Sequence, residues 1–124
     1  MIKMNDFKSE PQELQNEIAN NIQRVIKSGW YVLGPELEEF EASWAKTCGL
    51  NHAIGVGNGM EAIEISLRAC GIGPGDEVIT TSMSAFATVL SIIRSGATPI
   101  LADINKDTAI LNIESVERCI SKKT

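Results

Sequence analysis

Residues 53–62 of this chain are Ala53-Ile54-Gly55-Val56-Gly57-Asn58-Gly59-Met60-Glu61-Ala62. A short apolar run comes first, a glycine-rich turn follows, and a helical pattern begins after Gly59. Glycine lets the backbone turn sharply and approach a ligand closely. The first N–H groups of a helix lack partners within the helix, and the helix dipole adds positive charge there. The stretch therefore predicts a strand, a turn and a helix whose start can hold an anion such as phosphate, or else a plain tight connection.

Downstream of this stretch, extended and helical patterns alternate. The predicted strands are 53–56, 77–81 and 98–102, and the predicted helices are 60–70, 84–95 and 113–122, the last capped by Asn112. The first of these helices is apolar nearly all round, which predicts a buried helix. The order is typical of an α/β protein with a mostly parallel sheet flanked by helices. Because three strands leave an open sheet edge, we expect residues 53–124 to be the first part of a larger domain, cut before completion.

Upstream, residues 1–52 predict two amino-terminal helices joined by a loop. Ser9 and Gln12 fit a capping box at the start of the first helix, and Gly29 fits its end. The second helix is expected to begin at Pro35, because proline suits the first helical turn.

Composition limits the class of protein. Hydrophobic residues make up 44% of the chain and charged residues 22%, as in ordinary globular proteins. The net charge of −5 argues against nucleic acid, which needs a basic face. No stretch has the length of a membrane-spanning helix, so we expect no membrane partner. An odd number of widely spaced cysteines favours reduced thiols in the cytoplasm, and the spacing of Cys48 and His52 offers too few ligands for a metal.

Three phosphate-bearing ligands compete for the glycine turn. The spacing Gly57-x-Gly59-x-x-Ala62 fits a dinucleotide fingerprint, but the next predicted strand, 77–81, is not followed by the acidic residue that would hold the ribose. A nucleoside-triphosphate loop needs a lysine after its glycines, and none follows here. A single phosphate on a cofactor such as pyridoxal phosphate needs only the helix start and a few donors. A nicotinamide dinucleotide stays a minor alternative.

A series of motifs runs along nearly the whole chain. They are Ser28-Gly29-Trp30-Tyr31-Val32-Leu33-Gly34-Pro35-Glu36 with Glu39-Phe40-Glu41, the glycine turn itself, Gly71-Ile72-Gly73-Pro74-Gly75-Asp76-Glu77-Val78-Ile79-Thr80, Gly96-Ala97-Thr98-Pro99 and Ala102-Asp103-Ile104. Together they resemble the DegT/DnrJ/StrS family of pyridoxal-phosphate-dependent sugar aminotransferases. The resemblance implies the truncated large domain of a fold type I aminotransferase. It also implies a cytoplasmic homodimer that transfers an amino group, usually from glutamate, to a nucleotide-linked keto sugar.

The resemblance assigns the cofactor phosphate to the start of the predicted helix, at Asn58, Gly59, Met60 and Glu61. In the family, backbone N–H groups and a threonine hydroxyl bind this phosphate. Met60 stands where threonine is usual, so a hydrogen bond worth about 1 kcal/mol is missing. We expect Asn58, often serine or asparagine in the family, to donate a hydrogen bond locally.

Three aromatic residues are the remaining site candidates. The family stacks an aromatic ring on the pyridine at the position of Ala85, whereas this chain has Phe86 one residue later, a rotation of about 100° on a helix. Phe86 is therefore either a stacking residue or a core residue. Trp30 and Tyr31 lie in a loop that in the family is near the substrate, so we expect substrate contact there; the alternative is that they anchor the loop to the protein's own surface.

Transamination needs a lysine that bonds to the cofactor and shuttles the proton, and a carboxylate at the pyridine nitrogen. In this family both come later than residue 124. The chain's own lysines lie in polar or charged settings: Lys3, Lys8, Lys27, Lys46, Lys106, Lys122 and Lys123. We therefore expect no catalytic residue here, an inactive 124-residue polypeptide, and an aminotransferase in the full-length protein. A non-catalytic binding or regulatory module of the same fold is the other interpretation.

Overall fold

The computed structural model describes residues 4–124, apart from the Phe7 side chain. Contacts divide the chain into two compact units, Met1–Gly55 and Val56–Thr124. The sequence places the boundary between the amino-terminal helices and the α/β part after residue 52, a few residues before this division. Each unit is described by itself.

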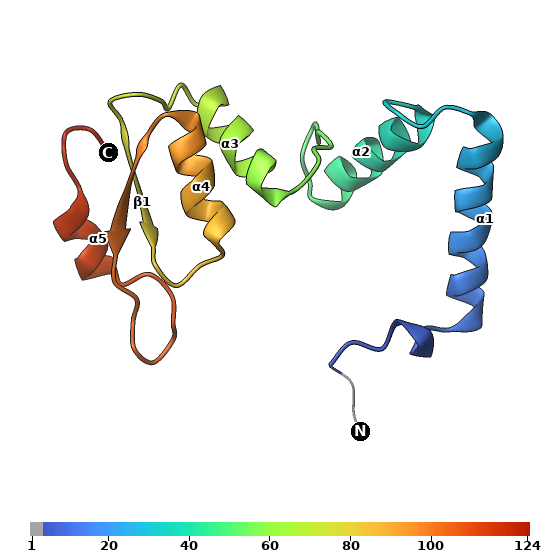
Figure 1. Ribbon diagram of the computed structural model, residues 1–124, viewed down its shortest axis with the longest axis horizontal. Coiled ribbons are helices and arrows are strands. Elements are labelled where there is room, and N and C mark those ends of the chain that lie inside the picture. Colours follow the sequence, from blue (N-terminus) through green and yellow to red (C-terminus); the bar gives the residue numbers. More distant parts are fainter. Residues whose placement is uncertain (1–3) are drawn as a thin grey trace. The chain divides into compact units, whose positions relative to one another are not determined.

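The first unit contains a short 3-10 helix, η1 (Phe7–Ser9), and the helices α1 (Gln12–Ser28) and α2 (Pro35–Thr47) (Figure 1). α1 ends at Gly29, whose φ of 67° is the left-handed conformation that glycine adopts without steric cost. Proline opens α2, as its fixed φ favours. Both helix boundaries agree with the sequence prediction.

The predicted capping box at the start of α1 is wrong. The Ser9 hydroxyl donates to the Asp6 carbonyl at 2.7 Å, inside the preceding 3-10 turn. Pro11 occupies the cap position of α1 and makes no side-chain capping bond. Ser9 is thus already used by a local turn, which competes with capping for the same hydroxyl.

The second unit is built around one strand–helix–strand unit. Its elements are α3 (Gly59–Ala69), β1 (Glu77–Thr81), α4 (Phe86–Ser95), β2 (Thr98–Ala102) and α5 (Ile113–Cys119). The two strands pair in parallel, with Glu77 opposite Thr98 and Thr81 opposite Ala102. α4 packs on α3 and on both strands, and α5 packs on β2. Figure 1 shows α4 on one side of the strands and α5 on the other. The parallel α/β architecture agrees with the prediction.

The predicted first strand, 53–56, is not a strand, because the sheet of the described residues contains only β1 and β2. One backbone group of this segment is used elsewhere: the Gly55 N–H donates to the Glu41 carboxylate at 2.6 Å. A β-carbon at Gly55 would lie 2.7 Å from Leu37 Cδ1, so α2 approaches this backbone closely. An extended apolar run forms a strand only where another strand supplies partners for its backbone.

The prediction that the 60–70 helix is buried is also wrong for this chain. No residue of α3 is buried, and the Ile65 side chain is 50% exposed. α4 covers one stripe of α3, and no other element packs extensively on this helix. The core of the second unit lies instead between α4 and the strands, around Ile92, Ala97 and Ala102. Apolar residues show that a helix can be buried, whereas burial itself depends on its neighbours.

The connection from α4 to β2 depends on a glycine. Gly96 ends α4 with a φ of 96°, which side-chain-bearing residues rarely adopt. A β-carbon there would also lie 2.9 Å from two ring carbons of Pro74. Because Gly96 has no β-carbon, the loop before β1 can pass close to the end of α4. The end of α4 at Gly96 agrees with the prediction.

Candidate functional site

The glycine turn leads into α3 through a side-chain cap. Asn58 has extended backbone angles, and its Oδ1 accepts a hydrogen bond of 3.0 Å from the Glu61 N–H. Asparagine is a preferred residue at this position, because its oxygen satisfies one of the free N–H groups of the first turn. The Asn58 side chain was expected to donate a hydrogen bond here, whereas its oxygen accepts one.

Glu61 completes this cap with its own carboxylate. Glu61 Oε2 accepts a hydrogen bond of 3.0 Å from the Gly57 N–H. A β-carbon at Gly57 would lie 2.7 Å from that oxygen, so glycine allows the close approach. The amides of Gly57 and Glu61 are therefore already bonded, and a negative charge lies beside the turn.

Two amides at the start of α3 remain free. Within residues 4–124, the N–H groups of Gly59 and Met60 have no hydrogen-bond acceptor. Nothing lies within 4 Å of the position where a Gly59 β-carbon would be. Adjacent free amides at a helix start are the donors that a phosphate group requires there. The residues present thus fit the phosphate of a cofactor, with the Gly59 and Met60 amides as backbone donors.

α4 lies beside α3 and has the same direction. The Ser91 hydroxyl donates to the Met60 carbonyl at 2.9 Å, and one turn later Arg94 Nε donates to Glu64 Oε2 at 2.6 Å. Because the contacting positions advance along both helices together, both amino-terminal ends lie at the same end of the pair. The chain enters this end of α4 directly from the carboxyl end of β1. In open α/β sheets, ligands bind at the carboxyl ends of the strands.

The ion pair between the two helices has a defined electrostatic character. Glu64 also accepts from Arg68, and its side chain is only 14% exposed. Burial by itself would raise the pKa of the Glu64 carboxyl, but the hydrogen bonds from Arg94 and Arg68 together lower it below its ordinary value. The carboxylate is thus held in its charged form at the centre of the α3–α4 contact.

Phe86 is the first residue of α4, and its side chain is 75% exposed. The interpretation as a core residue is therefore wrong for this chain, and the ring is available to a ligand. Two hydroxyl groups lie at the same helix end, with Ser84 Oγ and Thr88 Oγ1 2.9 Å apart. Neither hydroxyl belongs to a motif, so residue type alone does not identify them as ligand-binding groups.

Trp30 and Tyr31 belong to the first unit. Trp30 Nε1 donates to the Val32 carbonyl at 2.8 Å, and the Tyr31 hydroxyl donates to the Ile26 carbonyl at 3.3 Å. Their side chains are nevertheless 58% and 67% exposed. The polar atoms hold the loop to its own backbone, and the rings stay open to a partner.

Lysines and possible metal ligands are the remaining candidates for chemistry. All lysines among the described residues are exposed. In the same part of the chain, no group of three or more His, Cys, Asp and Glu side chains is arranged to bind a metal ion. None of its helices is long and apolar enough to cross a membrane.

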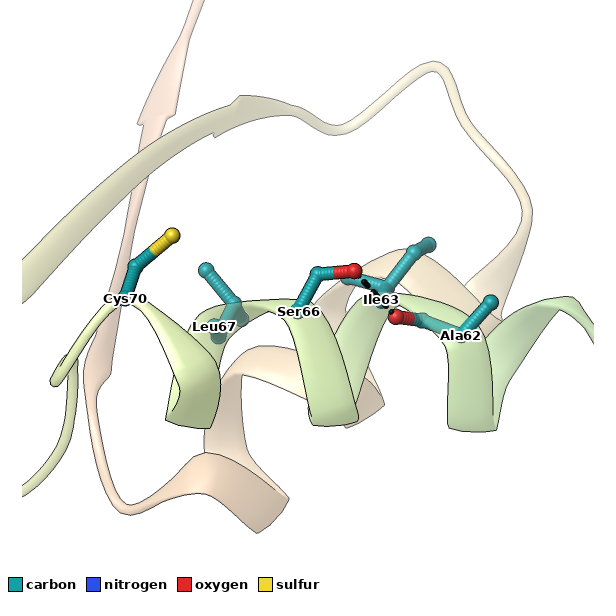
Figure 2. A pocket seen from close by; sticks show the side chains of 5 residues that line it. All are labelled: Ala62, Ile63, Ser66, Leu67 and Cys70. Atoms are coloured by element: carbon teal, nitrogen blue, oxygen red, sulfur yellow. Dashed lines mark hydrogen bonds between the residues drawn. The ribbon is translucent and has the colours of Figure 1, made fainter. Parts of the chain in front are cut away.

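A hollow of about 320 Å³ lies on a different face of α3. Figure 2 shows its lining side chains, Ala62, Ile63, Ser66, Leu67 and Cys70, along one side of the helix. The Ser66 hydroxyl donates to the Ala62 carbonyl, so the lining offers little free polarity. This apolar surface suits helix or sheet packing, and it is separate from the free amides at the start of α3.

Comparison with known proteins gives a consistent result. The model of the DegT/DnrJ/EryC1/StrS aminotransferase family matches residues 12–124. The dTDP-3-amino-3,4,6-trideoxy-alpha-D-glucose transaminase of Streptomyces venezuelae is 44% identical over 119 residues, which are 96% of this chain and 31% of the relative.

Two solved structures resemble the fold closely. The crystal structure of S. venezuelae DesV in complex with a ketimine intermediate has 44% identity and a TM-score of 0.90, over 96% of this chain and 32% of that one. The structure of NtdA from Bacillus subtilis with bound cofactor PMP has 30% identity and a TM-score of 0.86, over 99% of this chain and 30% of that one. The chain thus spans about a third of the length of these relatives.

Proposed function

Because the chain belongs to the DegT/DnrJ/EryC1/StrS aminotransferase family, we propose that it forms the cofactor-phosphate site of a pyridoxal-phosphate-dependent sugar aminotransferase. The full-length protein transfers an amino group, from glutamate as donor, to a keto sugar carried on a nucleotide. It acts as a homodimer in the cytoplasm. The S. venezuelae transaminase, named for a dTDP-linked amino sugar, supports the substrate class.

One observation carries the proposal. The free Gly59 and Met60 amides begin α3, and the exposed Phe86 ring begins the neighbouring helix, with both ends on the same side of the α3–α4 pair. A cofactor with one phosphate and one aromatic ring needs donors for the phosphate and an aromatic surface for the ring. The B. subtilis relative with bound PMP supports this choice over a dinucleotide.

Each predicted residue has a separate role in the proposed function. The Gly59 and Met60 amides bind the phosphate, and the Asn58 side chain keeps the first turn of α3 formed. The Phe86 ring lies against the cofactor ring and keeps water from one face of it. Trp30 and Tyr31 contact the sugar nucleotide. When bound, the pyridine ring of the cofactor withdraws electrons from the carbon that loses a proton.

The chain does not itself supply the proton-transferring lysine. The described lysines are all exposed, and none has the enclosed setting in which a lysine acts as a nucleophile. The lysine and the carboxylate at the pyridine nitrogen come from another part of the full-length protein. The 124-residue polypeptide alone therefore binds the cofactor phosphate without transferring amino groups.

A titration of the chain with pyridoxal phosphate tests the proposal. We expect a shifted phosphorus resonance of the cofactor, a raised melting temperature, and no amino-group transfer from glutamate to a dTDP-linked keto sugar. Absence of both binding signals would contradict the phosphate site. Borohydride reduction followed by peptide mapping gives a second test, because a cofactor fixed to one lysine at full occupancy would contradict the missing-lysine argument.

Two alternative functions can be distinguished by ligand-binding experiments. A nicotinamide dinucleotide that raises the melting temperature more than pyridoxal phosphate does would favour the dinucleotide-binding domain. A full-length protein that binds pyridoxal phosphate but lacks both the lysine and the ring-nitrogen carboxylate would favour the non-catalytic module.

A further inference from the structure

Ser91 is a fully buried hydroxyl that links two helices. Its side chain has 0% exposure, in the middle of α4. Its Oγ lies 2.6 Å from the Ala87 carbonyl in its own helix and 2.9 Å from the Met60 carbonyl in α3. The sequence offers no signal for this contact, since 31 positions separate Ser91 from Met60.

A hydroxyl has one proton, so the two carbonyls share the single hydrogen-bond donor of Ser91. The bond to Ala87 is the local one that serine makes in many helices. The bond to Met60 is different, because it joins α4 to the first turn of another helix. Met60 supplies one of the two free amides of the phosphate site, so this bond acts on the peptide next to the ligand.

Ser91 also connects the two parts of the proposed cofactor site. Phe86 precedes Ser91 by about one and a half helical turns, a rise of about 7.5 Å along α4. Ser91 therefore fixes the position of the first turn of α3 along α4, the helix that begins with Phe86. A shift of this contact changes the distance between the phosphate donors and the aromatic face.

We propose that Ser91 is a positioning residue that holds the Gly59 and Met60 amides at a set distance from Phe86, so that phosphate and ring of one cofactor molecule are bound together. The inference rests on the proposed function. Ser91 itself does not touch the cofactor, since its side chain is fully enclosed.

The variants Ser91→Ala and Ser95→Ala form a matched pair. Ser95 is 3% exposed in the same helix; its hydroxyl donates to the Ile92 carbonyl and accepts from the Ala97 N–H, and within residues 4–124 it makes no hydrogen bond to α3. Each variant loses one buried hydroxyl, so both are expected to melt at a lower temperature. A Ser91→Cys variant keeps the side-chain size with a weaker donor and covers the case that Ser91→Ala does not fold.

The measurements are made on the complete chain, below the melting temperature of every variant. Pyridoxal phosphate affinity is followed by phosphorus NMR, and the Gly59 and Met60 amide resonances are followed in proton–nitrogen correlation spectra without ligand. We expect Ser91→Ala to weaken pyridoxal phosphate binding about fivefold, the value of one lost hydrogen bond, and to shift both amide resonances. Ser91→Cys is expected to lie between wild type and Ser91→Ala, and Ser95→Ala to match the wild type in both readouts.

The outcomes distinguish the two proposals. If the wild-type chain binds pyridoxal phosphate and the folded Ser91 variants bind equally well, the positioning role is wrong and the proposed function stands. Equal losses of affinity in Ser91→Ala and Ser95→Ala would also overturn the positioning role, because general destabilisation would explain them. If the wild-type chain does not bind, both proposals fail.

Discussion

The Glu64 carboxylate of α3 accepts a hydrogen bond of 2.6 Å from Nε of Arg94 in α4. Arg68, one turn further along α3, bonds to the same carboxylate and to the Arg94 backbone carbonyl. This arrangement joins α3 and α4 about one helical turn after Met60, which supplies an amide of the proposed phosphate site. The stability of this ion-pair arrangement depends on the charge of Glu64.

Glu64→Gln should lower the melting temperature at neutral pH, because it removes the charge that both arginines contact. The pKa of Glu64 lies below its ordinary value of 4.5 in the folded chain. A lowered folded pKa gives stability that is complete above 4.5 and is lost as the pH falls through the folded value. The difference in melting temperature between wild type and Glu64→Gln should therefore narrow only below pH 4.5.

Glu117→Gln is the control for this experiment. Glu117 is exposed in α5 and forms no salt bridge within residues 4–124. The melting temperature of the Glu117→Gln variant should equal that of the wild type at every pH. A Glu64→Gln difference that stays constant down to about pH 3 would contradict the electrostatic explanation.

Glu61→Gln should raise the affinity for inorganic phosphate. The Glu61 carboxylate bonds to the Gly57 N–H and adds a negative charge beside the free amides. Removing one charge near a helix start should change the affinity about two- to fivefold, and the gain should shrink as salt is added. Phosphorus NMR titration measures both effects. Glu114→Gln, at the start of α5, should leave the affinity unchanged, and an unchanged affinity in Glu61→Gln would mean that the carboxylate does not oppose the ligand.

Met60→Thr should strengthen pyridoxal phosphate binding. Threonine adds a hydroxyl beside the free amides, and one such hydrogen bond contributes about 1 kcal/mol, or roughly fivefold in affinity. The comparison is with Met60→Val, which has nearly the shape of threonine without the hydroxyl. Equal dissociation constants for the two variants, measured by fluorescence titration, would show that no phosphate oxygen lies within reach of position 60.

Phe86→Ala should weaken pyridoxal phosphate binding while leaving stability nearly unchanged. The ring is 75% exposed, so its removal uncovers little core, whereas the loss of a stacked ring costs about 1 kcal/mol, or roughly fivefold in affinity. Ile93→Ala, at a 52% exposed position of the same helix, is the control and should not change the affinity. A large fall in melting temperature with unchanged affinity would identify Phe86 as a packing residue.

Local chemistry explains where the sequence predictions succeed. Asn112 accepts a hydrogen bond at the start of α5, and Gly29 and Gly96 end helices at positive φ. These features depend on residues within one turn, so the residue type is sufficient to predict them. The positions of β1 and β2 were predictable for a similar reason, since turn residues bound each short apolar run.

The sequence by itself therefore determined the order of the helices and of β1 and β2, the glycine ends of α1 and α4, and the glycine turn before α3. Only the tertiary structure decided that 53–56 remains unpaired, that no residue of α3 is buried, that Phe86 is exposed, and that Ser91 bonds to Met60. Pairing, burial and the Ser91 contact each require a second segment distant in the sequence. Such a partner is selected by packing in three dimensions, and the free energy of that packing is not carried by any single stretch of residues.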